Sequence, residues 1–151
     1  MAAELDPVDA ITQMSYLVQG ALERRADVHG VSLIQTRLLG ILRERKPTMN
    51  ELAQLLGLDK SSTSGLVDRA QRRGLVRRLR SQVDRRSVRV SLTAEGRALI
   101  QTVATDFQTD IAAIFDPLPF EDRVALTRIL SAALVAHASD HGIDLFAGTT
   151  S

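Results

Sequence analysis

The chain has 151 residues, about the length of one ordinary domain, with 44% hydrophobic residues, 25% charged residues and a formal net charge of +1. This composition is typical of a folded globular protein and excludes intrinsic disorder. The absence of cysteine excludes disulfides, thiolate metal sites and cysteine nucleophiles. One tyrosine and four phenylalanines are too few for the stacking platforms that bind single-stranded nucleic acid.

The sequence predicts neither a targeting segment nor a membrane span. The first ten residues, MAAELDPVDA, are acidic, whereas a secretory signal begins with basic residues and continues into an apolar run. No stretch approaches the roughly 18 uninterrupted apolar residues that a transmembrane helix needs. We therefore expect a cytoplasmic protein.

The charges are distributed unevenly along the chain. Of the 19 basic and 18 acidic residues, ten basic and two acidic ones lie in residues 60–90, so this segment carries +8 and the remainder carries −7. A concentrated positive field attracts a polyanion whatever the sum over the molecule. The segment therefore predicts a nucleic-acid partner, and the alternative is an arginine-rich face that is merely solvated.

Two helices are predicted before Pro47. Apolar residues spaced by three and four predict an amphipathic helix over residues 8–26, which residues 28–31 interrupt. Ser32 is a good N-cap for a second helix, which should stop before Pro47.

A helix-turn-helix is predicted next. Thr48 and Glu51 have the spacing of a capping box at the start of a short third helix, which breaks at Gly57. Asp59 is the N-cap of a fourth helix, and Gly74 is placed to be its left-handed C-terminal residue.

A basic hairpin should follow the fourth helix, because the period of the sequence changes from 3.6 to 2 at Leu75. The alternation resumes after the polar turn 81–86, with Val88, Val90 and Leu92 on one face and Arg89 and Ser91 on the other.

Two long helices complete the chain. Thr93 should cap the first, over residues 94–115, and the second should begin at about Glu121 and continue to residue 137. Their apolar rows, with Ile143, Leu145 and Phe146 beyond them, exceed what one small domain easily covers. They predict an interface between two copies of the chain, and an ordinary intrachain core is the alternative.

The fourth helix has the character of a DNA-recognition helix. Its predicted buried face consists of Thr63, Leu66, Val67 and Ala70. On the opposite face, small hydroxyls and a glycine would let the backbone approach a groove floor. Serines also commonly occupy helix starts, so the serine run alone is weak evidence. Together with the basic strands, it predicts DNA contacts from Lys60, Ser61, Ser62, Ser64, Gly65, Arg69 and Arg72.

The hairpin is expected to contact DNA as well. We expect these contacts from Arg78, Arg80, Arg85 and Arg86, of which the last two can reach an adjacent minor groove. Asp68 is a carboxylate on a surface that must face phosphates, so we expect Arg78 or Arg86 to hold it and thereby to orient the hairpin. Asp84 is assigned to the same orienting role.

The segments LVDRAQRRGLVRR (66–78) and DRRSVRVSLTAEG (84–96) resemble the winged helix-turn-helix of MarR-type transcriptional regulators. The resemblance covers residues 32–100 well and fits the order of helices over nearly the whole chain. It implies a mainly α fold with a small β-hairpin wing, as a single domain over residues 1–151. Within it, residues 32–93 would be the DNA-binding region, and residues 5–28 and 94–146 the dimerisation helices.

The same resemblance implies a homodimer on a pseudo-palindromic double-stranded DNA operator, usually as a repressor. It also implies a cleft for small, often aromatic and anionic effectors. Tyr16, His29 and Arg37 are polar residues near the helices that border it, and ordinary surface positions are an equal alternative for each.

No catalytic or metal-binding motif is recognisable. His137 and His141 have an i,i+4 spacing that some zinc sites use, but the third ligand of such a motif is missing. Asp140 and Asp144 leave a weak surface site as the alternative. No phosphate-cradling glycine loop or nucleophile motif occurs, so we expect no enzyme, no cofactor and no functional metal.

The sequence thus predicts a DNA-binding transcriptional regulator, a repressor that a small molecule releases. One alternative is a winged-helix DNA-binding protein without an effector. The other is a winged helix that binds proteins, which the +8 segment disfavours because such a module does not need a cationic wing.

Overall fold

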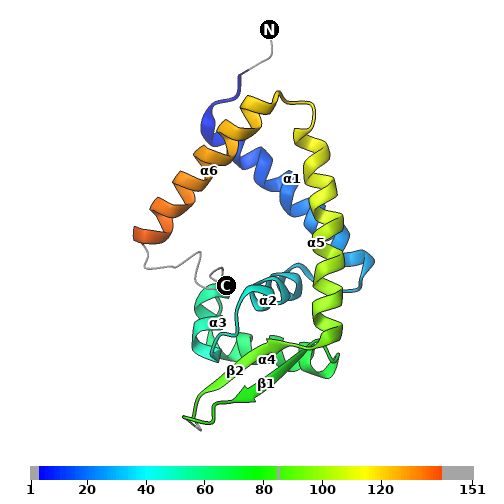
Figure 1. Ribbon diagram of the computed structural model, residues 1–151, viewed down its shortest axis with the longest axis vertical. Coiled ribbons are helices and arrows are strands. Elements are labelled where there is room, and N and C mark those ends of the chain that lie inside the picture. Colours follow the sequence, from blue (N-terminus) through cyan, green and yellow to red (C-terminus); the bar gives the residue numbers. More distant parts are fainter. Residues whose placement is uncertain (1–3, 85, 141–151) are drawn as a thin grey trace. The chain divides into compact units, whose positions relative to one another are not determined.

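The computed structural model describes residues 4–84 and 86–140, and it is mainly helical with one β-hairpin (Figure 1). The elements in chain order are α1 (Pro7–Val28), α2 (Leu33–Glu44), α3 (Met49–Leu56), α4 (Lys60–Arg72), β1 (Val76–Arg80), β2 (Val88–Leu92), α5 (Ala94–Phe115) and α6 (Phe120–Asp140). The predicted fold class is therefore confirmed. The chain forms two compact units, residues 1–111 and residues 112–151, and each is described by itself.

Side-chain caps fix the starts of the helices, as the sequence predicted. The Ser32 hydroxyl accepts a hydrogen bond from the Gln35 N–H, and the Gln35 side chain accepts one from the Ser32 N–H. Thr48 and Glu51 form the same reciprocal capping box at α3. Asp59 caps α4. Each such cap satisfies backbone donors that a helix start leaves without an intrahelical partner.

Two glycines end the helices of the helix-turn-helix. Gly57 has φ of 66° after α3, and Gly74 has φ of 72° after α4. A side chain would strain the backbone in this left-handed region, so glycine is favoured at both turns.

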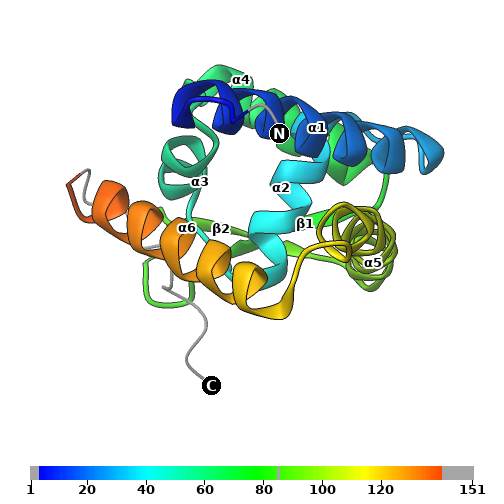
Figure 2. The same ribbon diagram turned by 90° about the horizontal axis from the view of Figure 1, so that it is seen from above.

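The core of the first unit draws on α1 to α5 and both strands. Its largest fully buried side chains include Leu38, Leu39, Leu42, Leu52, Leu66, Val67, Val76, Val90 and Val103. Burying one such side chain stabilises the fold by about 1.5–3 kcal/mol. In both ribbon views α2 lies between α3 and α5 (Figures 1 and 2). The core therefore joins the helix-turn-helix to the long helix α5.

The hairpin pairs Val76 with Leu92 at its base and Arg80 with Val88 near its tip. The Val90 N–H donates to the Pro47 carbonyl at 2.9 Å, so the segment before α3 covers the outer edge of β2. The strict alternation predicted for β2 is wrong at Ser91, which is buried. Its hydroxyl accepts a hydrogen bond from Nε of the facing Arg77, and this bond makes the burial tolerable.

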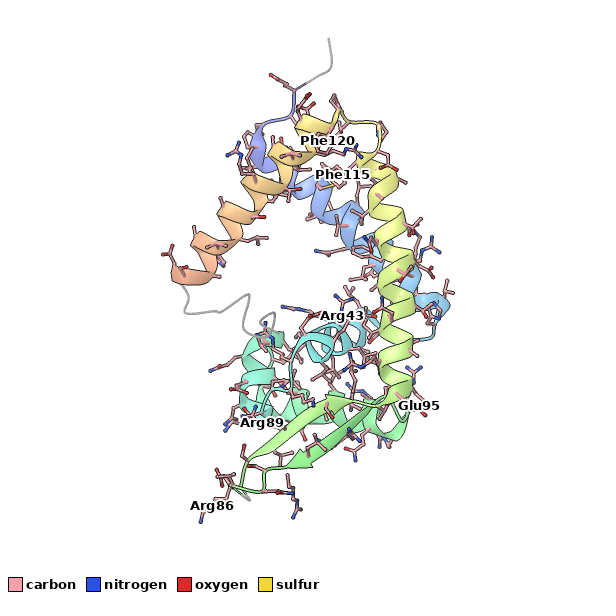
Figure 3. All side chains as sticks on the ribbon, viewed as in Figure 1. Arg43, Arg86, Arg89, Glu95, Phe115 and Phe120 are labelled. Carbon is pink, nitrogen blue, oxygen red and sulfur yellow. The ribbon has the colours of Figure 1, made fainter. Side chains whose placement is uncertain are left out.

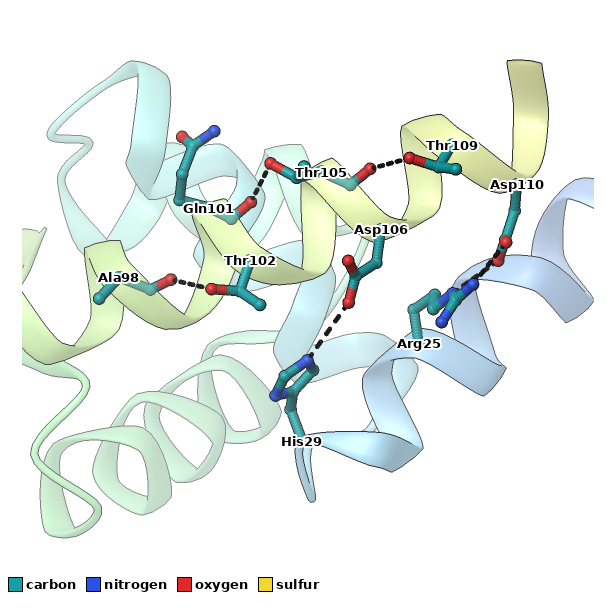
Figure 4. Close-up of polar contacts among 9 residues, drawn as sticks. All are labelled: Arg25, His29, Ala98, Gln101, Thr102, Thr105, Asp106, Thr109 and Asp110. Carbon is teal, nitrogen blue, oxygen red and sulfur yellow. Dashed lines mark hydrogen bonds and ion pairs between the residues drawn. The ribbon is translucent and has the colours of Figure 1, made fainter. Parts of the chain in front are cut away.

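Within the first unit, an ion pair joins α1 to α5 (Figure 4). The Arg25 guanidinium donates from Nε and Nη2 to the two carboxylate oxygens of Asp110, at 2.7 and 2.6 Å. This bidentate contact holds the pKa of the Asp110 carboxyl below its ordinary value. One turn away along each helix, Nε2 of His29 lies 3.8 Å from Oδ2 of Asp106.

Large apolar side chains are exposed on α6, in the second unit. Those more than 40% exposed are Phe120, Val124, Ile129, Leu130, Leu134 and Val135. Ile143, Leu145 and Phe146, which were expected to add to this surface, lie outside the described residues. None of the helices within the described ranges has the length and hydropathy that a bilayer crossing requires.

The first turn of α5 packs against Gly74 and Leu75, which connect α4 to β1. Thr93 caps α5 by accepting from the Gly96 N–H, and its own hydroxyl donates to the Gly74 carbonyl at 2.6 Å. A Cβ at position 96 would overlap the carbonyl oxygen of Leu75. The close approach of these two backbones therefore requires glycine.

We expect Gly96→Ala to lower the free energy of unfolding by about 1–3 kcal/mol, because the carbonyl it meets is backbone and cannot rotate away. Gly40→Ala is the matched control: it is also helical, and its Cβ would meet nothing within 4 Å. This control should stabilise the chain by up to about 1 kcal/mol. Urea unfolding of the two variants checks the prediction, which equal stabilities would contradict.

Candidate nucleic-acid interface

Helix α4, the predicted recognition helix, separates into the two faces that the sequence predicted. Thr63, Leu66, Val67 and Ala70 are at most 1% exposed, so the predicted buried face is confirmed. The seven residues expected to contact DNA lie on the other side of the helix. Lys60, Ser61, Ser62, Arg69 and Arg72 are exposed, and Ser64 and Gly65 are half-buried.

The first turn of α4 orients one of these hydroxyls. Ser62 donates twice to the Asp59 carboxylate, from its N–H at 2.8 Å and from its hydroxyl at 2.9 Å. These two bonds hold the pKa of the Asp59 carboxyl below its ordinary value. Because a carboxylate only accepts, the Ser62 hydroxyl proton is committed to Asp59 and the oxygen is left to act as an acceptor. The sequence revealed the cap but not the direction of this second bond.

One guanidinium joins the hairpin to the recognition helix. Nη2 of Arg78 lies 2.7 Å from the Asp68 carboxylate, and Nη1 donates to the Gln71 side chain at 2.8 Å. Arg78 was one of two arginines expected beside Asp68. Its guanidinium therefore has an intramolecular role, and its contact with DNA remains a prediction.

The tip of the hairpin is organised by short-range hydrogen bonds. Asp84 accepts from the Arg86 N–H at 3.0 Å, and the Ser81 hydroxyl accepts from the N–H groups of Val83 and Asp84. Arg86 is exposed at the tip (Figure 3). Asp84 therefore shapes the turn itself, while Arg85 lies outside the described residues.

Several cations of the +8 segment point back to the protein. Arg73 donates to the Gly30 carbonyl at 2.8 Å, which ties the end of α4 to the turn between α1 and α2. Arg89 donates to the Lys46 carbonyl at 2.8 Å. Arg77 and Arg78 have the partners described above. Arg73, Arg77 and Arg89 are exposed as well, but their guanidiniums donate to the protein. Among the described residues of the segment, the exposed cations whose side chains have no such partner are Lys60, Arg69, Arg72, Arg80 and Arg86, all of which the sequence assigned to DNA.

A cavity of about 360 Å³ lies among α1, α2 and α5. Its lining residues are Leu22, Thr36, Arg37, Gly40, Ile41, Arg43, Ile100, Val103, Ala104 and Phe107. The walls thus combine apolar side chains with two guanidiniums, a mixture that suits an apolar molecule with an anionic group.

Of the three residues expected to border an effector cleft, only Arg37 lines this cavity. Tyr16 is 64% exposed on α1, and His29 lies beside Asp106. The sequence missed Arg43 of α2 (labelled in Figure 3), which is the second cavity guanidinium and also pairs with Glu44. Arg43 follows Arg37 by six residues, which is about 120° around the helix, so the helical period gave no signal for it.

Within the part of the chain that the structure describes, no three His, Asp or Glu side chains gather as metal ligands. His141, the partner of His137 in the weak zinc pattern, lies outside that part.

Comparison with known proteins gives the family. The family model described as "MarR family" matches residues 29–87. The homoprotocatechuate degradative operon repressor of Escherichia coli is 33% identical over 104 residues, which are 68% of this chain and 70% of the repressor.

Solved structures agree with this match. The MepR–DNA complex of Staphylococcus aureus has a TM-score of 0.71 at 19% identity and covers 88% of this chain and 99% of its own. NadR in complex with 4-hydroxyphenylacetate has a TM-score of 0.70 at 22% identity and covers 88% and 95%. At these identities the likeness shows the fold alone. Taken with the relative and the family model, it leads to one conclusion: the chain belongs to the MarR family of transcriptional regulators.

Proposed function

We propose that the chain is a repressor that binds double-stranded DNA through α4 and the hairpin. The observation that carries this proposal is a set of exposed cations on α4 and the hairpin (Lys60, Arg69, Arg72, Arg80 and Arg86) whose side chains have no partner among the described residues. They lie beside a polar helix face, and Arg78 joins the two elements. A recognition helix reads base edges in the major groove while neighbouring cations hold phosphates. MepR, whose fold this chain shares, was crystallised with DNA.

The proposed assembly is a homodimer on a pseudo-palindromic operator. Large apolar side chains are exposed on α1, among them Val8, Ile11 and Leu17, as well as on α6. Exposed apolar surface of this extent marks an interaction site. Residues 5–28 and 94–146 would pair two copies of a single 1–151 domain, so that two recognition helices read two half-sites.

The proposed effector is an aromatic carboxylate in the cavity among α1, α2 and α5. Its apolar walls fit an aromatic ring, and Arg37 and Arg43 fit a carboxylate. NadR was crystallised with 4-hydroxyphenylacetate, and the relative from Escherichia coli represses a homoprotocatechuate degradative operon. A regulator of this kind acts in the cytoplasm, without a cofactor and without being an enzyme.

Selection of bound fragments from the native genome tests the proposal. We expect an enriched pseudo-palindrome whose half-sites lie about one helical turn apart, ~10 bp centre to centre. A single enriched half-site would contradict the dimer, and the absence of any enriched DNA would favour a protein-binding module.

Arg86→Ala should weaken binding to all DNA sequences and flatten the slope of log affinity against log salt by about one unit, because one phosphate contact is lost. Arg24→Ala, which removes an exposed arginine of α1, is the control and should leave the slope unchanged. Fluorescence anisotropy at several salt concentrations measures both. An unchanged slope for the Arg86 variant would place the hairpin tip away from DNA.

Asp68→Asn should lower operator affinity by about two- to fivefold, although it removes a negative charge near phosphates. The reason is the loss of the surface ion pair that orients the hairpin, worth about 0.5–1 kcal/mol. Arg78→Lys keeps the charge but cannot contact Asp68 and Gln71 with two separate nitrogens, so it should also lower operator affinity. In the double variant the two losses should not add. Tighter binding by Asp68→Asn with a steeper salt slope would show that the carboxylate only repels DNA.

Asp59→Asn should change which base Ser62 selects. In the native helix Ser62 can only accept, so it suits an amino group of cytosine or adenine. Asparagine caps a helix as well as aspartate does, but its NH₂ would donate to the Ser62 hydroxyl and turn that proton outward, toward a guanine or thymine oxygen.

Selection from a randomised half-site measures this shift, which we expect to be about fivefold, or ~1 kcal/mol for one hydrogen bond. Ser62→Ala identifies the position concerned, because it should lose the preference there. An unchanged preference in Asp59→Asn would refute the assignment.

A further inference from the structure

The guanidinium of Arg37 reaches the end of the first helix of the helix-turn-helix. Its Nη2 donates to the Leu55 carbonyl at 3.3 Å, and its Nη1 donates to the Leu56 carbonyl at 3.4 Å. These are the last two residues of α3, where carbonyls have no intrahelical donor. A cation at this end also interacts favourably with the helix dipole. Arg37 is therefore a side-chain cap of α3 that belongs to α2.

The same side chain lines the cavity among α1, α2 and α5. Arg37 thus stands between the cavity and the turn at Gly57, which leads directly into the recognition helix. The other cavity guanidinium, Arg43, is placed differently, because its Nε donates to the Glu44 carboxylate at 2.6 Å. Among the described contacts, Arg37 is the cavity arginine that hydrogen-bonds to α3.

The two carbonyls that accept hydrogen bonds from Arg37 hold its guanidinium weakly. Neutral carbonyls at 3.3–3.4 Å lie beyond the usual range of 2.7–3.2 Å for such bonds. A carboxylate accepts from a guanidinium at about 2.7–2.9 Å, often through two parallel bonds, and binds roughly twice as strongly. An anion in the cavity would therefore take the guanidinium from the two carbonyls.

We propose that Arg37 is the residue that transmits effector binding to the recognition helix. When an aromatic carboxylate occupies the cavity, Arg37 turns to it and releases the Leu55 and Leu56 carbonyls. The end of α3 and the turn at Gly57 then loosen, and α4, which packs on α3, loses its orientation for DNA. This inference rests on the proposed function, since it requires both DNA binding and an anionic effector.

The test compares Arg37→Met with Arg43→Met, two variants that keep an apolar stem but remove a cavity guanidinium. The probe is 4-hydroxyphenylacetate, with the neutral alcohol 2-(4-hydroxyphenyl)ethanol as its uncharged counterpart. We expect the acid to raise the operator Kd of the native chain by about 5- to 150-fold, the usual range of allosteric coupling. The alcohol should leave the operator Kd unchanged.

In Arg37→Met the operator Kd should already be raised without ligand, and the acid should not raise it further. Arg43→Met should bind the operator with the native Kd in the absence of ligand. The acid should raise this Kd by the native factor, but a higher concentration of acid should be needed. Arg37→Lys should recover the ligand-free affinity, because an ammonium can still donate to the two carbonyls. Thermal unfolding of all variants shows whether a loss comes from the fold as a whole.

Hydrogen exchange supplies a readout that needs no DNA. The acid should speed exchange of the backbone N–H groups of residues 57–59 in the native chain and leave them unchanged in Arg37→Met. The proposal would be overturned if the acid changed the hydrogen exchange and the operator Kd of Arg37→Met as it changes those of the native chain. It would also be overturned if the alcohol raised the operator Kd as much as the acid does. Failure of the acid to change either DNA binding or exchange would overturn it too, while leaving the DNA-binding function intact. If the native chain bound no DNA, the proposed function would fail, and exchange alone would decide whether Arg37 responds to the acid.

Discussion

The ion pair between Arg78 and Asp68 joins the hairpin to α4, the two elements through which we propose that the chain binds DNA. A two-stranded hairpin has little stability of its own, and most of this one extends away from the core. At its base, Val76 and Leu92 are buried, and Pro47 covers one edge. Beyond the base, Arg78 adds contacts to Asp68 and Gln71 on successive turns of α4. Beyond its base, the hairpin is therefore linked to α4 by one side chain with two partners.

The cations of residues 60–90 fall into two groups that differ in their contacts. Arg73, Arg77, Arg78 and Arg89 donate to groups of the protein itself, so they shape the surface. Lys60, Arg69, Arg72, Arg80 and Arg86 are exposed and, among the described residues, have no side-chain partner, so they are the cations left to meet an anionic ligand. The net charge of the segment alone could not separate the two groups, because an arginine that caps a carbonyl and one that meets a phosphate look alike in a sequence.

What could be predicted from the sequence were the features that depend on neighbours along the chain. The caps at Ser32, Thr48 and Asp59, the helix break at Gly57 and the left-handed Gly74 follow from local backbone chemistry. Ser91 was misplaced, because its burial depends on a bond from the opposite strand.

The candidate site was less accessible to sequence reasoning. The dual role of Arg37 depends on carbonyls 18 and 19 residues away. Tyr16 and His29 were predicted to border the cleft because of their positions along the chain. The residues that line the cavity depend instead on which faces of α1, α2 and α5 meet. Contacts between distant segments carry no periodic signal, so the residues that link elements remain the hardest to predict.

Those linking contacts fall into two chemical kinds, and the difference bears on regulation. The contact between α1 and α5 is the bidentate ion pair of Arg25 and Asp110, in which both N···O distances are below 2.8 Å. The helix-turn-helix is joined to its surroundings by arginine-to-carbonyl bonds: Arg73 to Gly30, Arg89 to Lys46, and Arg37 to Leu55 and Leu56. A neutral carbonyl holds a guanidinium less tightly than a carboxylate does. The buried core holds both regions, so it is among the polar contacts that the two differ: an anion can displace the arginine-to-carbonyl bonds more easily than the ion pair between α1 and α5. With no cysteine in the chain to sense oxidants, these bonds are where the proposed anionic effector would act.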